Sequence, residues 1–297
     1  MAYWGFLGFI KGYLSGFGQE VAPKILEIGV DKGQTFIPLY AYLLKTREKF
    51  QFTGVDVKTD ETLKIILEMM NWDTTEEQSI LLIKNNSLNF LERMEPLIES
   101  AEEYKSWGYW DLVLLDGDHN YYTVSRELEK LGKQLAKSGM IIIDDYDGRW
   151  SEKDEYFSEI DSYEEHLALL DTPEKTQGEK RGVKTAVDEF VENNPGWKLD
   201  KRVFPHHTPA LLYREEHVLL LEVPRGQDIS TAQEIYKEEI AEAANSQKLL
   251  LAFTGETTVE RTTDSPTFEV PYQDSEAAAI IREEQKKGKI IEGHEEK

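Results

Sequence analysis

The stretch Leu112–Asp118, Leu-Val-Leu-Leu-Asp-Gly-Asp, constrains the fold of this chain more than any other, because four apolar residues run directly into ionisable ones that continue with His119. Four consecutive apolar residues are typical of a strand covered on both faces, as in a parallel sheet. The acids then lie at the carboxyl end of the strand, which is the edge where open α/β sheets bind ligands. So much charge at the end of a buried strand needs a ligand or a partner.

A second stretch repeats this pattern, since the apolar run Met140–Ile143 is followed by three acids within Asp144–Asp147. A helix is expected between the two strands, with Ser138-Gly139 as its C-terminal stop. Its apolar residues share one face: Val124, Leu128, Leu131 and Leu135. A strand, a helix and a strand form one crossover, which keeps the strands parallel and brings Asp116 and Asp144 to the same edge.

The N-terminal part predicts another strand, glycine turn and helix. Lys24–Ile28 is the strand and Gly29–Gly33 the turn, and Thr35 can cap a helix whose first turn tolerates Pro38. The apolar side of this helix carries Phe36, Leu39, Tyr40, Leu43 and Leu44. The next strand, Phe50–Val57, ends near Asp56, and an acid about 20 residues beyond a glycine turn is placed to bind ribose hydroxyls.

The remaining elements complete the pattern of a doubly wound α/β fold with a mostly parallel, seven-stranded sheet. We expect a helix over Thr62–Met70, a strand at Ile80–Ile83 and a helix from Ser87 that cannot pass unbroken through Pro96. A helix marked by Val183, Val187, Phe190 and Val191 follows, and then an antiparallel pair formed by Trp197–Phe204 and Ala210–Arg214.

These elements divide the chain into an N-terminal helix or flap over residues 1–22, a main domain over 23–214 and a C-terminal extension over 215–297. The first is expected to pack on the core rather than to touch a membrane or form an oligomer. Ser151–Lys180 holds ten acidic and three basic residues, and is either a solvated loop or a lid over the site. The extension, with strands at His217–Val223 and Lys248–Phe253 around a helix at Thr231–Ala244, is an accessory unit or an oligomerisation arm.

The charge of the chain bounds its partners. There are 57 Asp and Glu against 34 Lys and Arg, so the protein's field would repel nucleic acid and anionic membranes. The expected partner is therefore a small molecule or a protein, which includes a second copy of this chain in a homo-oligomer. Without cysteine the chain has no disulfide or thiolate chemistry. No apolar run approaches the roughly 18 residues of a spanning helix, and Lys11 follows the N-terminal apolar stretch instead of preceding it, so we expect a cytoplasmic protein.

The glycine turn Glu27-Ile-Gly29-Val-Asp-Lys-Gly33 lacks the G-x-G-x-x-G spacing of dinucleotide-binding proteins. An acid two residues before the first glycine suits a cofactor without a pyrophosphate, since glycines allow close backbone approach and Glu27 can meet a cationic group. A glycine turn between strand and helix is also common without any binding role. The turn alone therefore leaves both interpretations open.

Four motifs together resemble the class I S-adenosylmethionine (SAM)-dependent methyltransferases: Leu26-Glu-Ile-Gly-Val-Asp-Lys-Gly33, Thr53-Gly-Val-Asp56, Leu115-Asp-Gly-Asp-His-Asn-Tyr121 and Ile143-Asp-Asp-Tyr146. More narrowly, they resemble the metal-dependent small-molecule O-methyltransferases of the macrocin O-methyltransferase type, which include sugar-modifying enzymes of macrolide and aminocoumarin biosynthesis. The resemblance covers roughly Ile25 to Arg214. Its glycine motif is shared by many methyltransferases, whereas the last two motifs are fairly specific to this branch.

The resemblance implies a role for each of six residues in holding SAM. Glu27, Gly29 and Gly33 would face its methionine part. Asp56 would bind the ribose, and Asn86 and Ser87 the adenine. The chain departs from the family at the adenine position, where Asn85-Asn86-Ser87 stands in place of the more frequent Gly-Asp-Ser.

By the same resemblance, Asp116, Asp144 and Asp145 match the family's metal ligands. Three clustered carboxylates repel one another unless a cation or protons intervene, and hard oxygen ligands suit Mg²⁺. A bound divalent ion lowers the pKa of an alcohol as it does that of water. The expected reaction is therefore SAM-dependent, divalent-metal-assisted methyl transfer to a hydroxyl of a small polar acceptor, of the sugar or diol type.

Two neighbouring residues can take the acceptor's proton. His119 has the more suitable intrinsic pKa, and Asp118 is the other candidate. Asp118 can equally cap the next helix, and His119 can be a hydrogen-bonded turn residue.

Two rival functions remain. One is a catalytically inactive methyltransferase-fold protein that binds or assembles with a partner. The other, nucleic-acid methylation, is disfavoured by the charge of −23 and by the lack of an Asn/Asp-Pro-Pro-Tyr motif.

Overall fold

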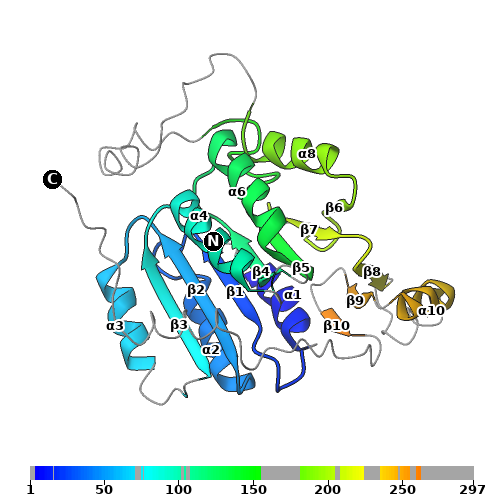
Figure 1. Ribbon diagram of the computed structural model, residues 1–297, viewed down its shortest axis with the longest axis horizontal. Coiled ribbons are helices and arrows are strands. Elements are labelled where there is room, and N and C mark those ends of the chain that lie inside the picture. The colour runs from blue at the N-terminus through cyan, green and yellow to red at the C-terminus, as the bar shows by residue number, and fades with distance from the viewer. Residues whose placement is uncertain are drawn as a thin grey trace.

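The computed structural model of the chain describes residues 4–15, 17–70, 75, 77–101, 104, 108–154, 181–204, 208–223, 235–246, 248–254 and 259–261. Within these residues the main element is a seven-stranded sheet with the order β3-β2-β1-β4-β5-β7-β6 (Figure 1). Its strands are β1 (Lys24–Ile28), β2 (Phe50–Asp56), β3 (Gln78–Lys84), β4 (Trp110–Leu115), β5 (Leu135–Ile143), β6 (Trp197–Asp200) and β7 (Ala210–Arg214).

Strand direction and order confirm the predicted doubly wound α/β fold. The first five strands run parallel to one another, and β7 runs antiparallel to both β5 and β6. The chain builds the sheet outward from β1 to β3 on one side and then returns to place β4 on the other side of β1. The carboxyl edge between β1 and β4 is therefore a topological switch point, where such sheets form their binding crevice.

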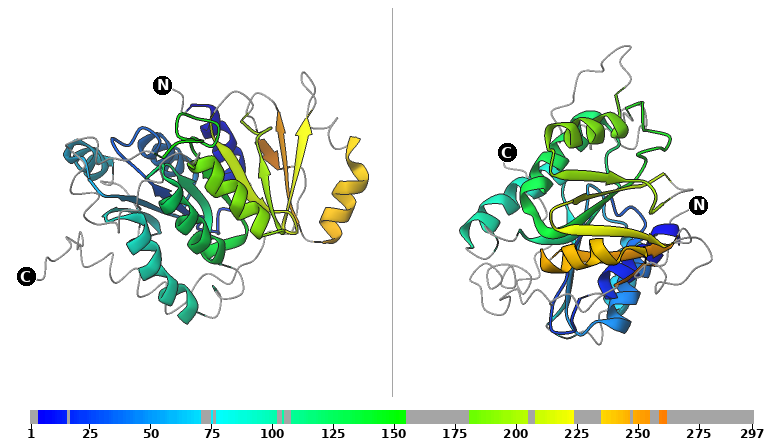
Figure 2. Two further views of the ribbon diagram at one scale, coloured as in Figure 1. Left: turned by 90° about the horizontal axis from the view of Figure 1, so that it is seen from above. Right: turned by 90° about the vertical axis from the view of Figure 1, so that its right-hand side faces the viewer.

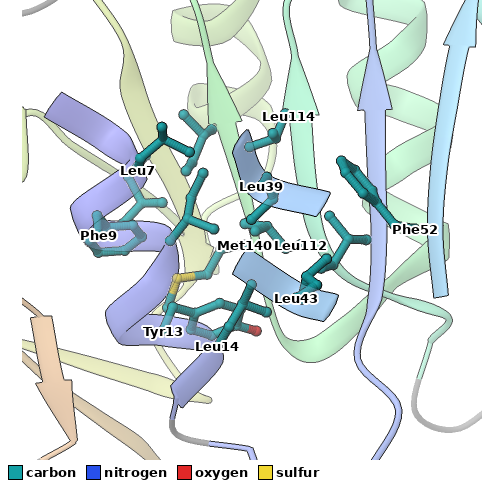
Figure 3. Close-up of a cluster of buried hydrophobic side chains, with 14 of the residues drawn as sticks. Leu7, Phe9, Tyr13, Leu14, Leu39, Leu43, Phe52, Leu112, Leu114 and Met140 are labelled. Atoms are coloured by element: carbon teal, nitrogen blue, oxygen red, sulfur yellow. The ribbon is translucent and has the colours of Figure 1, made fainter. Parts of the chain in front are cut away.

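Helices cover both faces of the sheet. One face packs against α1 (Trp4–Ser15), α2 (Phe36–Thr46) and α3 (Glu61–Met70), and the other against α4 (Ser87–Ser100), α6 (Tyr121–Gln134) and α8 (Val183–Asn193). Leu112 and Leu114 point into the first core, which Figure 3 shows, and Val113 and Leu115 into the second. This alternation explains why β4 is apolar at every one of these positions, as expected of a strand covered on both faces.

The N-terminal helix α1 contributes several of the largest buried side chains, among them Phe9 and Tyr13. The Tyr13 hydroxyl donates hydrogen bonds to the carbonyl oxygens of Asp111 (2.9 Å) and Ser138 (3.2 Å), at the amino end of the sheet. Arg47 anchors the segment after α1 by donating to the carbonyl oxygens of Phe17, Gly18 and Val21. These contacts hold the C-terminal end of α1 on the core.

Two predicted helix ends are wrong. Helix α4 continues through Pro96, because buried side chains on both sides of the proline, including Met94 and Ile98, keep the helix on the sheet and offset the lost hydrogen bond. Helix α6 ends at Gln134 instead of Ser138-Gly139, and residues 135–139 already belong to β5. The register shift between Trp110 and Leu112 accommodates this longer strand.

Other local predictions are corrected as well. Thr35 precedes α2 but makes no side-chain capping bond, because its backbone is already helical (φ −96°, ψ −43°). Strand β6 ends at Asp200 instead of Phe204. Of the predicted acidic segment Ser151–Lys180, residues 155–180 lie outside the described part of the chain.

Beyond β7 the chain forms a small three-stranded sheet in the order β10-β9-β8, from β8 (Val218–Val223), β9 (Leu249–Thr254) and β10 (Val259–Arg261). β10 lies against α1, and α10 (Lys237–Asn245) lies on the outer side of this sheet, away from the parallel strands (Figures 1 and 2). Residues 231–234 of the predicted helix are outside the described ranges. No helix among the described residues has the length and hydropathy needed to cross a bilayer.

Candidate functional site

A pocket of about 640 Å³ opens at the carboxyl ends of β1, β2, β3 and β4, at the switch point of the sheet. Seven of the residues singled out from the sequence line it: Gly29, Asp56, Asn86, Ser87, Asp116, Asp118 and His119. A neighbouring cavity of about 10 Å³, roughly the room that one water molecule needs, is lined by Glu27, Asp116 and Asp144 among others. Asp116 therefore lies between the large pocket and a small acidic one.

The glycine turn after β1 has a conformation that only glycine accommodates easily. Gly29 has a φ of +86°, and a Cβ atom built on it would lie 1.8 Å from the carbonyl oxygen of Asp116. The turn can therefore pass directly beneath the loop after β4. Gly33 also has a positive φ, of +75°, but its nearest neighbours are the side chains of Leu63 and Ile37, so it shapes the turn without lining the pocket.

Asp56 holds this turn from the end of β2. Its Oδ2 accepts hydrogen bonds from the backbone N–H groups of Val30 and Asp31, each over 2.8 Å, and its Oδ1 accepts from Lys58 N over 2.8 Å. A carboxylate has about four acceptor sites, so Asp56 keeps capacity for a ligand in the pocket that it lines.

At the end of β3, next to β2, Asn86 is the N-cap of α4. Its side chain accepts a hydrogen bond from Asn89 N over 2.8 Å, and Asn86 is 3% exposed. Ser87, the first residue of the helix, is also buried. Asn and Asp cap helices equally well. Asn86 can therefore serve as the N-cap although the Gly-Asp-Ser pattern has Asp at this position.

Glu27 is a charged side chain in the interior of β1, with 3% exposure. Burial raises its pKa well above the ordinary value, and the charges of Asp116 and Asp56 raise it further. Its Oε2 has no hydrogen-bond partner among the residues that the structure describes. A buried carboxylate oxygen left in this way fits a cationic or hydrogen-bond-donating ligand.

The imidazole of His119 lies between two carboxylates. Its Nε2 is 3.5 Å from Oδ1 of Asp116, and its Nδ1 is 3.9 Å from Oδ2 of Asp145. Burial lowers the pKa of His119, although the charges of Asp145 and Asp144 oppose this. Burial likewise raises the pKa of Asp145, against the effect of His119. Asp145 also has a left-handed backbone (φ +54°), which turns the loop after β5 back toward the site.

The three predicted metal ligands come from neighbouring strand ends but face different partners. Asp116 and Asp145 flank His119, while Asp144 accepts a hydrogen bond from the Thr208 hydroxyl (2.8 Å). Among the described residues, no three His, Cys, Asp or Glu side chains already surround one point as a metal site requires. Their chemistry nevertheless fits a hard divalent cation, because such ions prefer carboxylate oxygens as ligands. Asp116 and Asp144 line one small cavity together with Glu27, whose Oε2 has no hydrogen-bond partner among the described residues.

Asp118 supports the start of α6. Its Oδ2 accepts hydrogen bonds from Asn120 Nδ2 (2.8 Å) and from the Thr123 hydroxyl (2.6 Å). Asn120 is the N-cap itself, because its side chain accepts from Thr123 N over 3.1 Å. Asp118 is 7% exposed. Asp118 therefore positions the N-cap residue Asn120. The sequence left open that Asp118 is the N-cap itself, and in the structure Asn120 has that place.

Two residues near the site were not identified from the sequence. Glu127 is a fully buried acid in α6. Burial raises its pKa to about 8, with hydrogen bonding to Ser87 opposing and the charge of Asp118 adding to the shift. Its signal was an acid on the apolar face of a helix, three residues after Val124. Thr208 had no such signal, because only the reversed direction of β7 brings it to this edge.

One protein-family profile matches the part of the chain that carries most of the site residues. Residues 26–146, which contain the glycine turn and all three strand-end aspartates, match the profile of a family described as a methyltransferase domain. No curated protein matches the chain in sequence.

The solved structures that match this chain have low sequence identity to it. CalS11, a TDP-rhamnose 3′-O-methyltransferase of calicheamicin biosynthesis, is 15% identical with a TM-score of 0.46, covering 70% of this chain and 78% of its own. The Podospora anserina methyltransferase PaMTH1, bound to S-adenosylhomocysteine (SAH), is 13% identical with a TM-score of 0.42, covering 71% and 77%. A putative rRNA methylase from Clostridium thermocellum is 14% identical with a TM-score of 0.40, covering 71% and 96%.

Proposed function

We propose that this chain, which carries a methyltransferase domain over residues 26–146, transfers a methyl group from SAM to a hydroxyl of a small polar acceptor of the sugar or diol type. A divalent cation assists the transfer. The observation that carries the proposal is the place of Asp116, which lines both the large pocket at the switch point and the small cavity shared with Glu27 and Asp144. A cofactor bound in the pocket thus adjoins the acidic cluster.

The pocket suits SAM in size and polarity. Its volume of about 640 Å³ lies within the range of 300 to 1,000 Å³, roughly, of small-molecule sites. Because Gly29 has no side chain, the backbone of Asp116 can lie directly against the glycine turn, and both residues line the pocket. The buried Glu27 carboxylate would hold the ammonium group of the methionine part, Asp56 the ribose hydroxyls, and Asn86 and Ser87 the adenine edge.

At the acceptor side, Asp116, Asp144 and Asp145 would hold the cation, which when bound lowers the pKa of the acceptor hydroxyl and orients it. Burial raises the pKa of Asp145, and the negative charge of Asp144 adds to the shift, so a positive charge beside these two carboxylates would be favourable. The net charge of −23 supports a small acceptor instead of nucleic acid.

His119 would act as the general base. Because its pKa lies below the ordinary histidine value, its imidazole is neutral near pH 7 and has a lone pair free to take a proton. The carboxylates of Asp116 and Asp145 then stabilise the imidazolium. As the acceptor oxygen bonds to the methyl carbon, the carbon–sulfur bond breaks, its electrons pass to sulfur, and SAH is the product.

Purified protein incubated with SAM, Mg²⁺ and a panel of glycosides and diols should form SAH and a methylated acceptor, both measured by mass spectrometry. Asp144→Ala or EDTA should abolish this activity. Activity that survives both would contradict the role of the cation and leave the methyl transfer itself in place.

A second candidate, a methyltransferase-fold protein that binds or assembles with a partner without catalysis, is favoured by one observation. The described residues do not yet form a complete ligand set around one point. Calorimetric titration separates the two candidates, since failure to bind SAM or SAH, with or without Mg²⁺, would favour the inactive protein.

A further inference from the structure

Thr208 reaches the acidic edge of the sheet because β7 runs antiparallel to the parallel strands β1 to β5. Ala210, the first residue of β7, pairs with Ile143, the last residue of β5. The residues just before β7 therefore lie beside the aspartates just after β5, although more than sixty positions separate them in the chain. No parallel strand could bring its own beginning to this edge.

The Thr208 hydroxyl donates a hydrogen bond to Oδ1 of Asp144 over 2.8 Å. An ionised carboxylate only accepts hydrogen bonds, so the hydroxyl proton must point at the aspartate. This contact fixes the rotation of the carboxylate and leaves Oδ2 and one acceptor site of Oδ1 for other partners. Asp144 is thus held by a side chain from the segment that leads into β7.

The backbone of Thr208 is itself held from two sides. Its carbonyl oxygen accepts hydrogen bonds from Asp147 N (3.0 Å) and from Lys201 Nζ (3.3 Å). Lys201 also donates to the carbonyl oxygen of Pro209 (2.8 Å) and forms an ion pair with Asp147 (2.9 Å). The loop after β5 and the segment that leads into β7 are therefore joined at Thr208, and this junction places the Thr208 hydroxyl beside Asp144.

We infer that Thr208 is a positioning residue, which orients Asp144 as a ligand of the divalent cation. The inference rests on the proposed function, because it assumes that Asp144 holds the cation. Side chains that hydrogen-bond to a ligating group fix its orientation, and removing such a partner typically weakens metal binding by about 10- to 100-fold. A residue that only joined β5 to β7 would instead affect the stability of the fold and leave the cation's affinity unchanged.

The test compares three variants of the full chain in the presence of saturating SAH. Thr208→Val keeps the shape of the side chain and removes the donor, whereas Thr208→Ser keeps the donor. Thr46→Val is the matched control, since Thr46 donates only to the Tyr42 carbonyl oxygen at an exposed site in α2. Calorimetry measures the dissociation constant of Mg²⁺ and separately that of SAH, and thermal unfolding measures Tm.

We expect Thr208→Val to weaken Mg²⁺ binding about tenfold or more, with SAH affinity unchanged, while Thr208→Ser and Thr46→Val bind Mg²⁺ like the wild type. If Thr208→Val binds Mg²⁺ as tightly as the wild type while Asp144→Asn loses Mg²⁺ binding, the inferred role of Thr208 is overturned. The proposed cation site would then still stand. A parallel loss of Mg²⁺ and SAH affinity would also overturn it, by showing a general effect on the domain. Absence of Mg²⁺ binding by the wild type would overturn the cation's part in the proposed function as well.

If Thr208→Val does not fold, Thr208→Ala provides the same comparison with a smaller side chain. Its Mg²⁺ affinity, measured against Thr208→Ser, should then show the same loss. Equal affinities of these two variants would contradict the inference.

Discussion

The hydroxyl of Thr123 donates a hydrogen bond to Oδ2 of Asp118 over 2.6 Å, inside the first turn of α6. The same oxygen accepts from the amide of Asn120, which caps the helix. Asp118 therefore stabilises the start of α6. Its neighbour His119 instead faces Asp116 and Asp145. For this reason we propose His119, and not Asp118, as the base.

Replacing Asp118 should affect stability more than chemistry. Asp118→Ala leaves the Thr123 hydroxyl and the Asn120 amide without their acceptor in a buried place, and we expect a loss of roughly 1 to 3 kcal/mol in the free energy of unfolding. Asp118→Asn keeps one acceptor oxygen and should lose less. Denaturant unfolding measures both, and a large fall of kcat in Asp118→Asn with unchanged stability would instead assign Asp118 the proton transfer.

Replacing His119 should affect chemistry more than stability. His119→Asn removes the base, so kcat should fall by about 10²- to 10⁴-fold while SAH binding persists. In the wild type, kcat/KM should fall as the pH drops through the pKa of His119, which lies below the ordinary value of 6.5, because the protonated imidazole cannot accept a proton. This acid limb should disappear in His119→Asn, and an unchanged limb would assign it to another group.

Glu127 should make the stability of the fold depend on pH. Its pKa is raised by burial from 4.5 in the unfolded chain to about 8 in the folded one. Between these values the folded state binds the proton more tightly, so the free energy of unfolding falls as the pH rises, by up to about 1.4 kcal/mol per pH unit.

Glu127→Gln removes this titration and is the variant that tests it. Near pH 5 the variant and the wild type should be similarly stable, whereas near pH 8 the variant should be the more stable one. Denaturant unfolding at both pH values makes the comparison. A wild type whose stability relative to Glu127→Gln does not change with pH would show that Glu127 is ionised in the folded protein.

The glycine turn provides a prediction with its own control. Gly29→Ala places a Cβ 1.8 Å from the Asp116 carbonyl oxygen at a positive φ, so the β1 and β4 loops must separate. We expect a loss of more than about 2 kcal/mol in the free energy of unfolding and loss of SAH binding. Gly196→Ala is the control, because no atom lies within 4 Å of its added Cβ. Equal behaviour of both variants would contradict the proposed contact between the two loops.

Much of this architecture can be predicted from the sequence, because apolar runs ending in acids identify β4 and β5 and one crossover fixes their direction. The end of β2 at Asp56 was also predicted from the sequence. Local boundaries were harder, since packing of Met94 and Ile98 carries α4 through Pro96. The contact of Thr208 with Asp144 depends on the pairing of β5 with the reversed β7, which no local sequence pattern reveals.

The central claim is that the pocket between β1 and β4 binds SAM, and calorimetric titration of the purified chain with SAM tests it most directly. The account predicts saturable one-to-one binding by the wild type and its loss in Gly29→Ala, with Gly196→Ala binding like the wild type. A wild-type protein that does not bind SAM, in the presence or absence of Mg²⁺, would contradict the account.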